Sequence, residues 1–200
     1  MAIPLDPGAG GHTVPSSTLR VADIIVSTTN ANVSRAIRVG TGSSVSHAML
    51  YVGDDLVVEA IGDGVVLRPL ASALQEATLA VAYRHHRLRS DETRAMQVRD
   101  FVGHQIDKDY NYAGLAGAGP VRRLLCATSL MHPTGPILCL LSTAQGMRPA
   151  RDVAFFCSEL VTRAFESVDL PLGTRANQMT PEGLARLRFT ALGYVGHLIT

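Results

Sequence analysis

The sequence has few cysteines, few charges and no long apolar run, and each shortage excludes a class of protein. Its three cysteines are an odd number without CxxC spacing, so neither a disulfide framework nor a zinc site is predicted. Only 18% of the 200 residues are charged and the net charge is +1, which argues against nucleic acid as a partner. No apolar run is long enough to cross a bilayer, so we expect no transmembrane segment.

Apolar residues, by contrast, are plentiful enough for one core. They make up 46% of the chain, and 200 residues suit a domain that needs no disulfide or metal to fold. Residues 1–18 contain Pro and Gly but no basic region followed by an apolar one, which predicts a flexible lead-in rather than a secretory signal. We expect a single catalytic domain over 19–200, made in the cytoplasm and reaching any other compartment by a dedicated route.

Apolar periodicity predicts both strands and helices along this domain. The runs divided by the turn sequences GDD and GDG indicate a β-meander, and Pro181 after Thr180 indicates the start of a helix. The expected strands are one from Leu19, three over 46–70, one over 78–85 and one in the tail from Phe189; the expected helices are 32–41, 90–106, 158–168 and one from Pro181.

Residues 113–150 differ from the rest of the chain in composition. They are rich in Gly, Ala and Pro, almost without acids, and apolar in short bursts. We interpret them as a helical insertion or cap, with a surface for a membrane or a partner as the alternative. Cys126 and Cys139 fall within this segment and are expected to be packed thiols.

Cys157 lies between an apolar run and an amphipathic helix, in the stretch DVAFFCSELVTRAF at 152–165. A thiol becomes a nucleophile when its pKa is lowered, and a helix N-terminus with a nearby imidazolium is the usual means. The helix N–H groups also suit an oxyanion. Free cysteines are nevertheless among the residues most often buried, so a packed thiol is the alternative until a histidine partner is found.

His47 is the candidate partner, and Glu59 is the candidate that orients it. His47 opens an apolar strand after a Ser-rich loop, where a capped strand end is the alternative. Glu59 lies in the apolar run LVVEAIG, and a buried carboxylate needs a partner. A three-residue hairpin loop, 53–55, would pair Met49 with Glu59 and place Glu59 roughly 7 to 8 Å from His47 on the same face. A two-residue loop would turn it to the other face, leaving Asp63 in the GDG turn as the fallback.

Three stretches together resemble a known superfamily: SHAMLYVGDDLVVEA at 46–60, DKDYNYAGL at 107–115 and FFCSELVTRAF at 155–165. They are similar to the circularly permuted, YiiX-like branch of the NlpC-type papain-fold amidases, with lecithin:retinol acyltransferase as a more distant relative. The resemblance implies an α+β, papain-like fold, circularly permuted, in which an antiparallel sheet or partial barrel packs against helices. One departure is Ala22, which stands where the family often has glycine before the first strand.

The resemblance also implies roles for particular residues. Cys157 would be the nucleophile, His47 the base and Glu59 the third member of a triad, and a thioester would form and be hydrolysed without metal or organic cofactor. Ser46, Ser158 and Glu159 match the family's motifs. Tyr110 and Tyr112 lie in its Tyr-rich segment, so that Tyr110, Tyr112, Ser46 and Ser158 are expected near the substrate or oxyanion.

Three functions follow from these expectations. The first is a cysteine amidase that cleaves peptidoglycan stem peptides, acting as an antibacterial effector that a secretion system delivers to a rival's periplasm, with an immunity or delivery partner. The second is a thiol acyltransferase or lipase acting on lipid esters. The third is a binding module that keeps the fold without catalysis.

Overall fold

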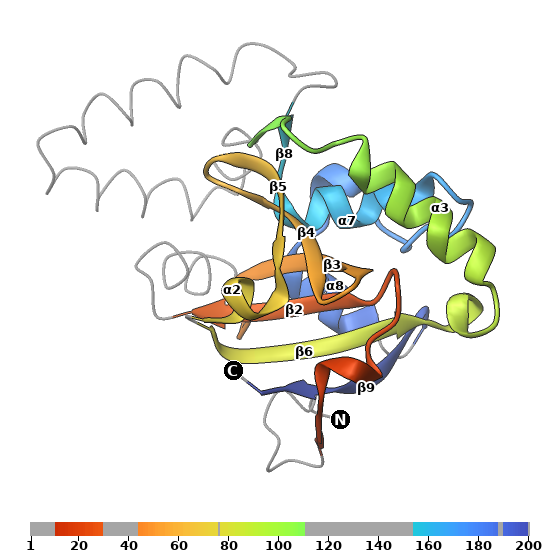
Figure 1. Ribbon diagram of the computed structural model, residues 1–200. Helices are drawn as coiled ribbons and strands as arrows, with labels where there is room; N and C mark the ends of the chain where they lie inside the picture. The colour runs from red at the N-terminus through yellow and green to blue at the C-terminus, as the bar shows by residue number, and fades with distance from the viewer. Residues whose placement is uncertain (1–10, 30–43, 76, 111–153, 188–189, 200) are drawn as a thin grey trace, which may run out of the picture.

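A seven-stranded sheet forms the centre of the computed structural model, which describes residues 11–29, 44–75, 77–110, 154–187 and 190–199 (Figure 1). Its strand order is β1-β9-β6-β2-β3-β4-β5, and every neighbouring pair is antiparallel except β1 and β9. The strands are β1 (Thr13–Val14), β2 (Ile24–Thr29), β3 (His47–Gly53), β4 (Leu56–Ile61), β5 (Gly64–Pro69), β6 (Ala77–His85) and β9 (Leu192–Leu198).

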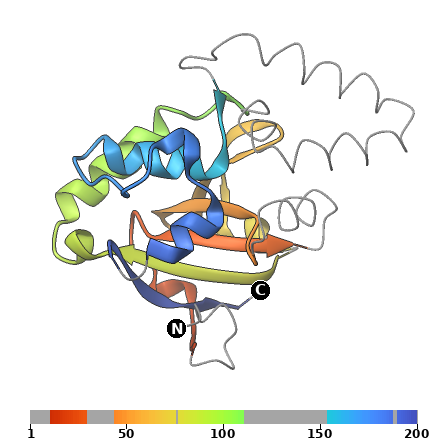
Figure 2. The ribbon, with the colours of Figure 1, turned by 180° about the vertical axis from the view of Figure 1, so that it is seen from behind.

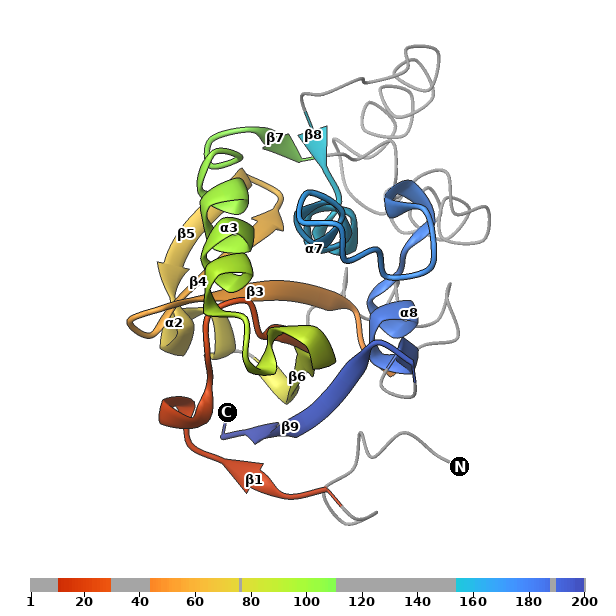
Figure 3. The ribbon, with the colours of Figure 1, turned by 90° about the vertical axis from the view of Figure 1, so that its right-hand side faces the viewer.

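Helices cover both faces of this sheet. Figure 3 shows α3 and α7 side by side, and α2 lies in front of the sheet in Figure 1, whereas α8 lies in front of it in the reverse view of Figure 2. None of the described helices combines the length and the hydropathy that crossing a membrane requires. The helices are α2 (Leu70–Leu74), α3 (Glu92–Gly103), α7 (Cys157–Glu166) and α8 (Pro181–Arg186), with 3-10 turns η2 (Ser16–Thr18), η3 (His86–Arg89) and η4 (Ala176–Gln178).

The alternation of side chains along the strands gives the sheet an apolar core on each face. On β3, Ala48 and Leu50 join the larger core with α3, α7 and α8, while Met49 and Tyr51 join a second core with α2. Because successive strand residues point to opposite faces, one short strand serves both cores. This α+β arrangement, an antiparallel sheet packed against helices, is the predicted fold class.

The helices begin close to where the sequence indicates. The Thr180 side chain accepts a hydrogen bond from Gly183 N at 3.0 Å, and Pro181 opens α8 as predicted. The α3 cap is Asp91, one residue after the expected Ser90, and its carboxylate accepts from Arg94 N at 3.0 Å. Asp and Ser are both favourable N-caps, so sequence alone does not choose between neighbours.

Residues 13–18 are more structured than a flexible lead-in. Thr13 and Val14 pair in parallel with His197 and Leu198 at the edge of the sheet. The close approach requires Gly196, where a Cβ would lie 2.6 Å from a Val14 methyl carbon. The structured domain therefore begins before Leu19, through pairing with a strand nearly 180 residues later that no local pattern signals.

A two-stranded parallel ladder closes the chain around the predicted insertion. Strands β7 (Asp109–Tyr110) and β8 (Ala154–Phe155) pair with each other. The described residues on the two sides of 111–153 are thus held next to each other, just before Cys157. The expected helix over 32–41, the segment 113–150 and both of its cysteines lie outside the described residues.

A buried ion pair links β2 to β6. Asp23 is fully buried, and its carboxylate accepts from Arg84 Nε at 2.7 Å, from Arg84 Nη2 at 2.6 Å and from Arg20 N at 2.9 Å. Burial raises the pKa of Asp23, and the hydrogen bonds and charge of Arg84 offset this only in part. The preceding Ala22 has φ 69°, in the left-handed region that favours glycine.

Arg84→Met is expected to lower the free energy of unfolding by about 3–5 kcal/mol, because it leaves the Asp23 carboxylate buried without its cation. Denaturant unfolding measures the change. The matched control is Arg99→Met, since Arg99 and its partner Asp100 are both exposed and such pairs contribute little. Equal stability of the two variants would contradict a structural role for the Asp23–Arg84 pair.

Candidate active site

The β3–β4 hairpin combines a two-residue loop with the pairing that was expected only of a three-residue loop. Asp54 and Asp55 form a two-residue turn with φ of 52° and 54°, and Gly53, at φ 99°, pairs with Leu56. Two successive positive φ values are typical of the type I′ turn of tight hairpins. The register then shifts between Tyr51 and Gly53, so that Met49 pairs with Glu59. The sequence left the loop length open, but the expectation that a two-residue loop would turn Glu59 to the other face was wrong, because a β-bulge supplies the extra residue that this pairing requires.

This register brings Glu59 to His47. Glu59 Oε2 lies 2.5 Å from His47 Nε2, and the Glu59 side chain is completely buried while that of His47 is 21% exposed. Asp63, the fallback, is exposed in the turn between β4 and β5. The carboxylate that sequence analysis selected is therefore the one in contact with the histidine.

The other carboxylate oxygen of Glu59 has a partner that sequence analysis missed. Arg68 Nε forms an ion pair with Glu59 Oε1. Burial raises the pKa of Glu59, but the hydrogen bond and charge of His47, together with Arg68, more than offset this and lower it. The signal was present, because a carboxylate on an apolar strand needs a cation and Arg68 lies on the neighbouring strand.

Cys157 reaches the same histidine from a different part of the chain. It is the first residue of α7, which packs on β3 and β4, and it is 1% exposed. Its thiol lies close enough to the His47 ring to raise the pKa of that histidine through its charge and hydrogen bonding. Because Nε2 contacts Glu59, Nδ1 is the ring nitrogen left for the thiol.

The electrostatics of His47 reflect both neighbours. Burial alone lowers the pKa of His47, but the negative charge and hydrogen bond of Cys157, followed by those of Glu59, raise it to about 10. An imidazolium flanked by a thiolate and a carboxylate is a stable arrangement of alternating charges. The ring therefore carries its proton through the neutral range.

The backbone at the start of α7 suits a negative charge. The first intrahelical bond runs from Leu160 N to Phe156 O at 2.9 Å, so the N–H groups of Cys157 and Ser158 precede the hydrogen-bond ladder of the helix. Such groups, with the helix dipole, attract anions. The Ser158 hydroxyl instead points inward and donates to Met179 O at 2.6 Å, in a fully buried position.

The remaining predicted residues are placed as follows. Ser46 is buried beside His47 and its N–H donates to Ser27 O at 3.0 Å. Glu159 is buried and accepts from Arg163 at 2.9 Å. Tyr110 belongs to β7 by its backbone, and Tyr112 lies outside the described residues. The structure thus brings Cys157, His47 and Glu59 together and engages Ser158 with a carbonyl of the protein itself.

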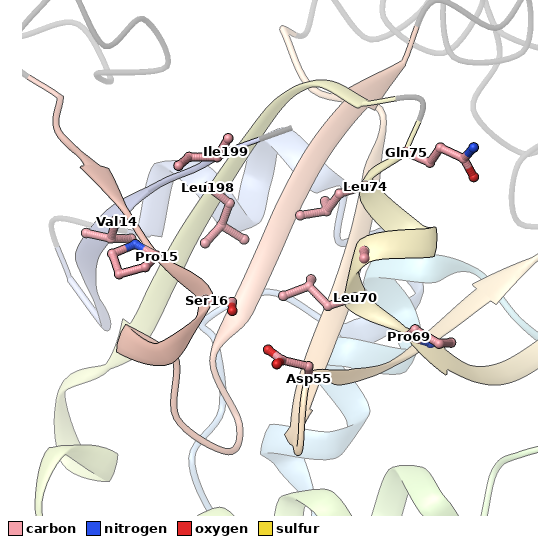
Figure 4. Close-up of a pocket in the computed structure, with 11 residues that line it drawn as sticks. Val14, Pro15, Ser16, Asp55, Pro69, Leu70, Leu74, Gln75, Leu198 and Ile199 are labelled. Atoms are coloured by element: carbon pink, nitrogen blue, oxygen red, sulfur yellow. The ribbon is translucent and has the colours of Figure 1, made fainter.

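A separate hollow of about 530 Å³ lies away from these side chains (Figure 4). It is mainly apolar and runs between the N-terminal segment and α2, and none of Cys157, His47, Glu59 and Arg68 lines it. Its lining residues include Val14, Leu70, Leu74 and Leu198. Its distance from the thiol separates it from the candidate chemistry.

Comparison with known proteins finds similarity both in sequence and in structure. The chain is 28% identical over 201 aligned positions to the probable lipoprotein peptidase YaeF of Escherichia coli (strain K12), covering 92% of this chain and 73% of that one. It is similar to the crystal structure of the metalloprotein YiiX from Escherichia coli O157:H7, with a TM-score of 0.52 and 18% identity, covering 86% of this chain and 82% of that one. No family model matches.

These similarities confirm the papain-like α+β fold expected from the sequence. YiiX is described as a metalloprotein. Among the residues that the structure of this chain describes, no group of three or more His, Cys, Asp or Glu side chains could hold a metal ion.

Proposed function

We propose that the protein is a cysteine amidohydrolase in which Cys157 is the nucleophile, His47 the acid and base, and Glu59 the residue that orients His47. The observation that carries the proposal is that one imidazole ring contacts both the Cys157 thiol and the buried Glu59 carboxylate. A histidine held by a third group next to a thiol is the arrangement that nucleophilic catalysis by cysteine requires. The similarity to a probable peptidase supports the same class of reaction.

The reaction would proceed through a thioester. The Cys157 thiolate attacks an amide carbonyl, and the N–H groups at the start of α7 stabilise the oxyanion. The His47 imidazolium then gives its proton to the leaving amine, which breaks the C–N bond. A water molecule, deprotonated by the now neutral His47, hydrolyses the thioester and restores the thiolate–imidazolium pair.

The order of the catalytic residues supports a permuted papain-like enzyme. His47 and Glu59 lie on consecutive strands, and Cys157 follows about a hundred residues later, whereas ordinary members of the superfamily place the cysteine first. Within the proposal, the substrate is a peptidoglycan stem peptide and the site of action is the periplasm of a target cell. The peptidase name of the sequence relative supports a peptide substrate.

Incubation with purified muropeptides and, in parallel, with phospholipid vesicles tests this function. Mass spectrometry is expected to show muropeptide products heavier by one water in total, with intact phospholipids. Cys157→Ala provides the blank for contaminating hydrolases. Release of fatty acid from the vesicles while the muropeptides stay intact would overturn the amidase assignment in favour of a thiol acyltransferase or lipase.

A further inference from the structure

Glu59 lies on the middle one of three neighbouring strands, between His47 on one side and Arg68 on the other. The sheet order places β4 between β3 and β5. Met49 pairs with Glu59, so His47 is its diagonal neighbour on β3. Glu59 pairs with Val66 and Val57 pairs with Arg68, so Arg68 is its diagonal neighbour on β5. Because side chains alternate with a period of two, His47, Glu59 and Arg68 lie on the same face.

The contacts use both oxygens of the carboxylate. Oε2 receives His47 Nε2 and Oε1 receives Arg68 Nε, while the Glu59 side chain is completely buried. A carboxylate held at one oxygen can rotate about its last bond, but one held at both oxygens cannot. The direction in which the His47 ring donates its hydrogen bond to Glu59 is therefore fixed by Arg68, on the far side of Glu59.

We propose that Arg68 is a positioning residue for the catalytic group: it holds Glu59 ionised and in one orientation, and through Glu59 it orients the His47 ring toward Cys157. The inference deepens the proposed function and rests on it for its effect on rate. The effect on Glu59 itself needs no substrate, so the two are tested separately. Arg68 is a positioning residue because another side chain stands between it and the thiol.

The charges around Glu59 support this role. Among the described residues, the titratable and charged groups recorded against Glu59 are His47 from β3 and Arg68 from β5, while Cys157 of α7 acts on His47. The neighbouring α2, of sequence LASAL, brings none. Arg68, Glu59, His47 and Cys157 thus form a row of alternating charges, and Arg68 is its positive end. The Arg68 side chain is 35% exposed, so it connects these buried side chains to the surface of the protein.

Two substitutions separate the charge of Arg68 from its geometry. Arg68→Met removes both, whereas Arg68→Lys keeps the charge but loses the planar fork that fixes Nε. Arg186→Met is the matched control, since Arg186 is exposed on α8 and pairs with Glu182. The first readout is the acid-range inflection of the His47 ring signals in NMR, which reports protonation of Glu59.

In Arg68→Met this inflection is expected to move up by about one pH unit, and in Arg68→Lys by less. The acid limb of kcat/KM should move with it, and kcat/KM near neutrality should fall roughly tenfold in Arg68→Met. The control should match the wild type in both readouts. In a Glu59→Gln background, Arg68→Met should lower kcat/KM by no more than about a further twofold, because the effects of residues that act as one unit are not additive.

An acid-range inflection that stays in place in Arg68→Met would overturn the inference. So would a further fall in kcat/KM of roughly tenfold when Arg68→Met is added to Glu59→Gln. Should Arg68→Met fail to fold, Arg68→Lys decides: a lower kcat/KM with a nearly unshifted acid limb supports positioning, and wild-type kcat/KM contradicts it. A wild-type protein without amidase activity would defeat the proposed function while leaving the NMR result to decide on Arg68.

Discussion

Cys157→Ala is expected to lower kcat/KM for amide hydrolysis by at least about 10⁴-fold, which is the scale of losing a covalent nucleophile. The thiol lies at the start of α7 and raises the pKa of His47, and the hydroxyl of the neighbouring Ser158 cannot replace it, since that hydroxyl donates to Met179 O. Steady-state kinetics measures the loss.

Two controls accompany this experiment. Far-UV circular dichroism and a thermal melt check that Cys157→Ala folds, because the side chain is buried and its removal leaves a small void. Cys139→Ala tests whether the loss belongs to this thiol rather than to thiols in general, and it should keep its activity. Hydrolysis by folded Cys157→Ala at more than a few per cent of the wild-type rate would remove Cys157 from the reaction.

Glu59→Gln is the second large effect, with an expected fall in kcat/KM on the order of a hundredfold or more. The substitution keeps the shape but removes the charge that fixes the tautomer and orientation of the histidine. Glu59 is one of the causes that raise the pKa of His47 to about 10, so in Glu59→Gln the pKa of His47 should fall. The alkaline limb of kcat/KM, where the imidazolium is lost, should then move to lower pH.

The same shift predicts a change in stability with pH. A histidine whose folded pKa is raised from 6.5 to about 10 contributes stability that is fully present below pH 6.5 and is lost as pH rises through about 10. In Glu59→Gln that contribution should be smaller and should end at a lower pH. Glu92→Gln, on the exposed first turn of α3, is the control. A pH-rate profile identical to that of Glu92→Gln would contradict the role of Glu59.

Local patterns were sufficient for most of the fold. The alternation in SHAMLYVGDDLVVEA predicted the hairpin that carries His47 and Glu59, and the stripe of Leu160, Val161, Ala164 and Phe165 predicted α7, all four of whose residues are buried. These apolar patterns repeat every two residues in a strand and every 3.6 in a helix, so a short stretch of sequence is enough to detect them. Thr180 and Pro181 marked the start of α8 in the same way.

Features that depend on distant or subtle geometry were not predictable in that manner. The sequence left the length of the hairpin loop open, and the chain uses two residues with a bulge between Tyr51 and Gly53, a combination that was not foreseen because it depends on backbone angles. The edge strand β1 depends on Gly196, far along the chain. Arg68 was overlooked because its role appears only when the β4–β5 register is known.

The meeting of Cys157 with His47 was anticipated from the resemblance rather than from any local pattern. The two residues are 110 positions apart, and the β7–β8 pair that returns the chain to the start of α7 is only two residues long on each side. Its sequence, DY opposite AF, carries no strand signal that would have been recognised. The pairing of nucleophile and base is thus a property of the whole fold.

The central claim, that Cys157 forms a thioester with the substrate while His47 serves as its acid and base, has one direct test. The enzyme is mixed with muropeptide, quenched in acid during the first turnover and digested, and the peptide containing Cys157 is examined by mass spectrometry. The account predicts that this peptide carries the acyl portion of the substrate, that the adduct disappears on raising the pH, and that Cys157→Ala yields none. An adduct on any other residue, or an unchanged rate of turnover after complete alkylation of the Cys157 thiol, would contradict it.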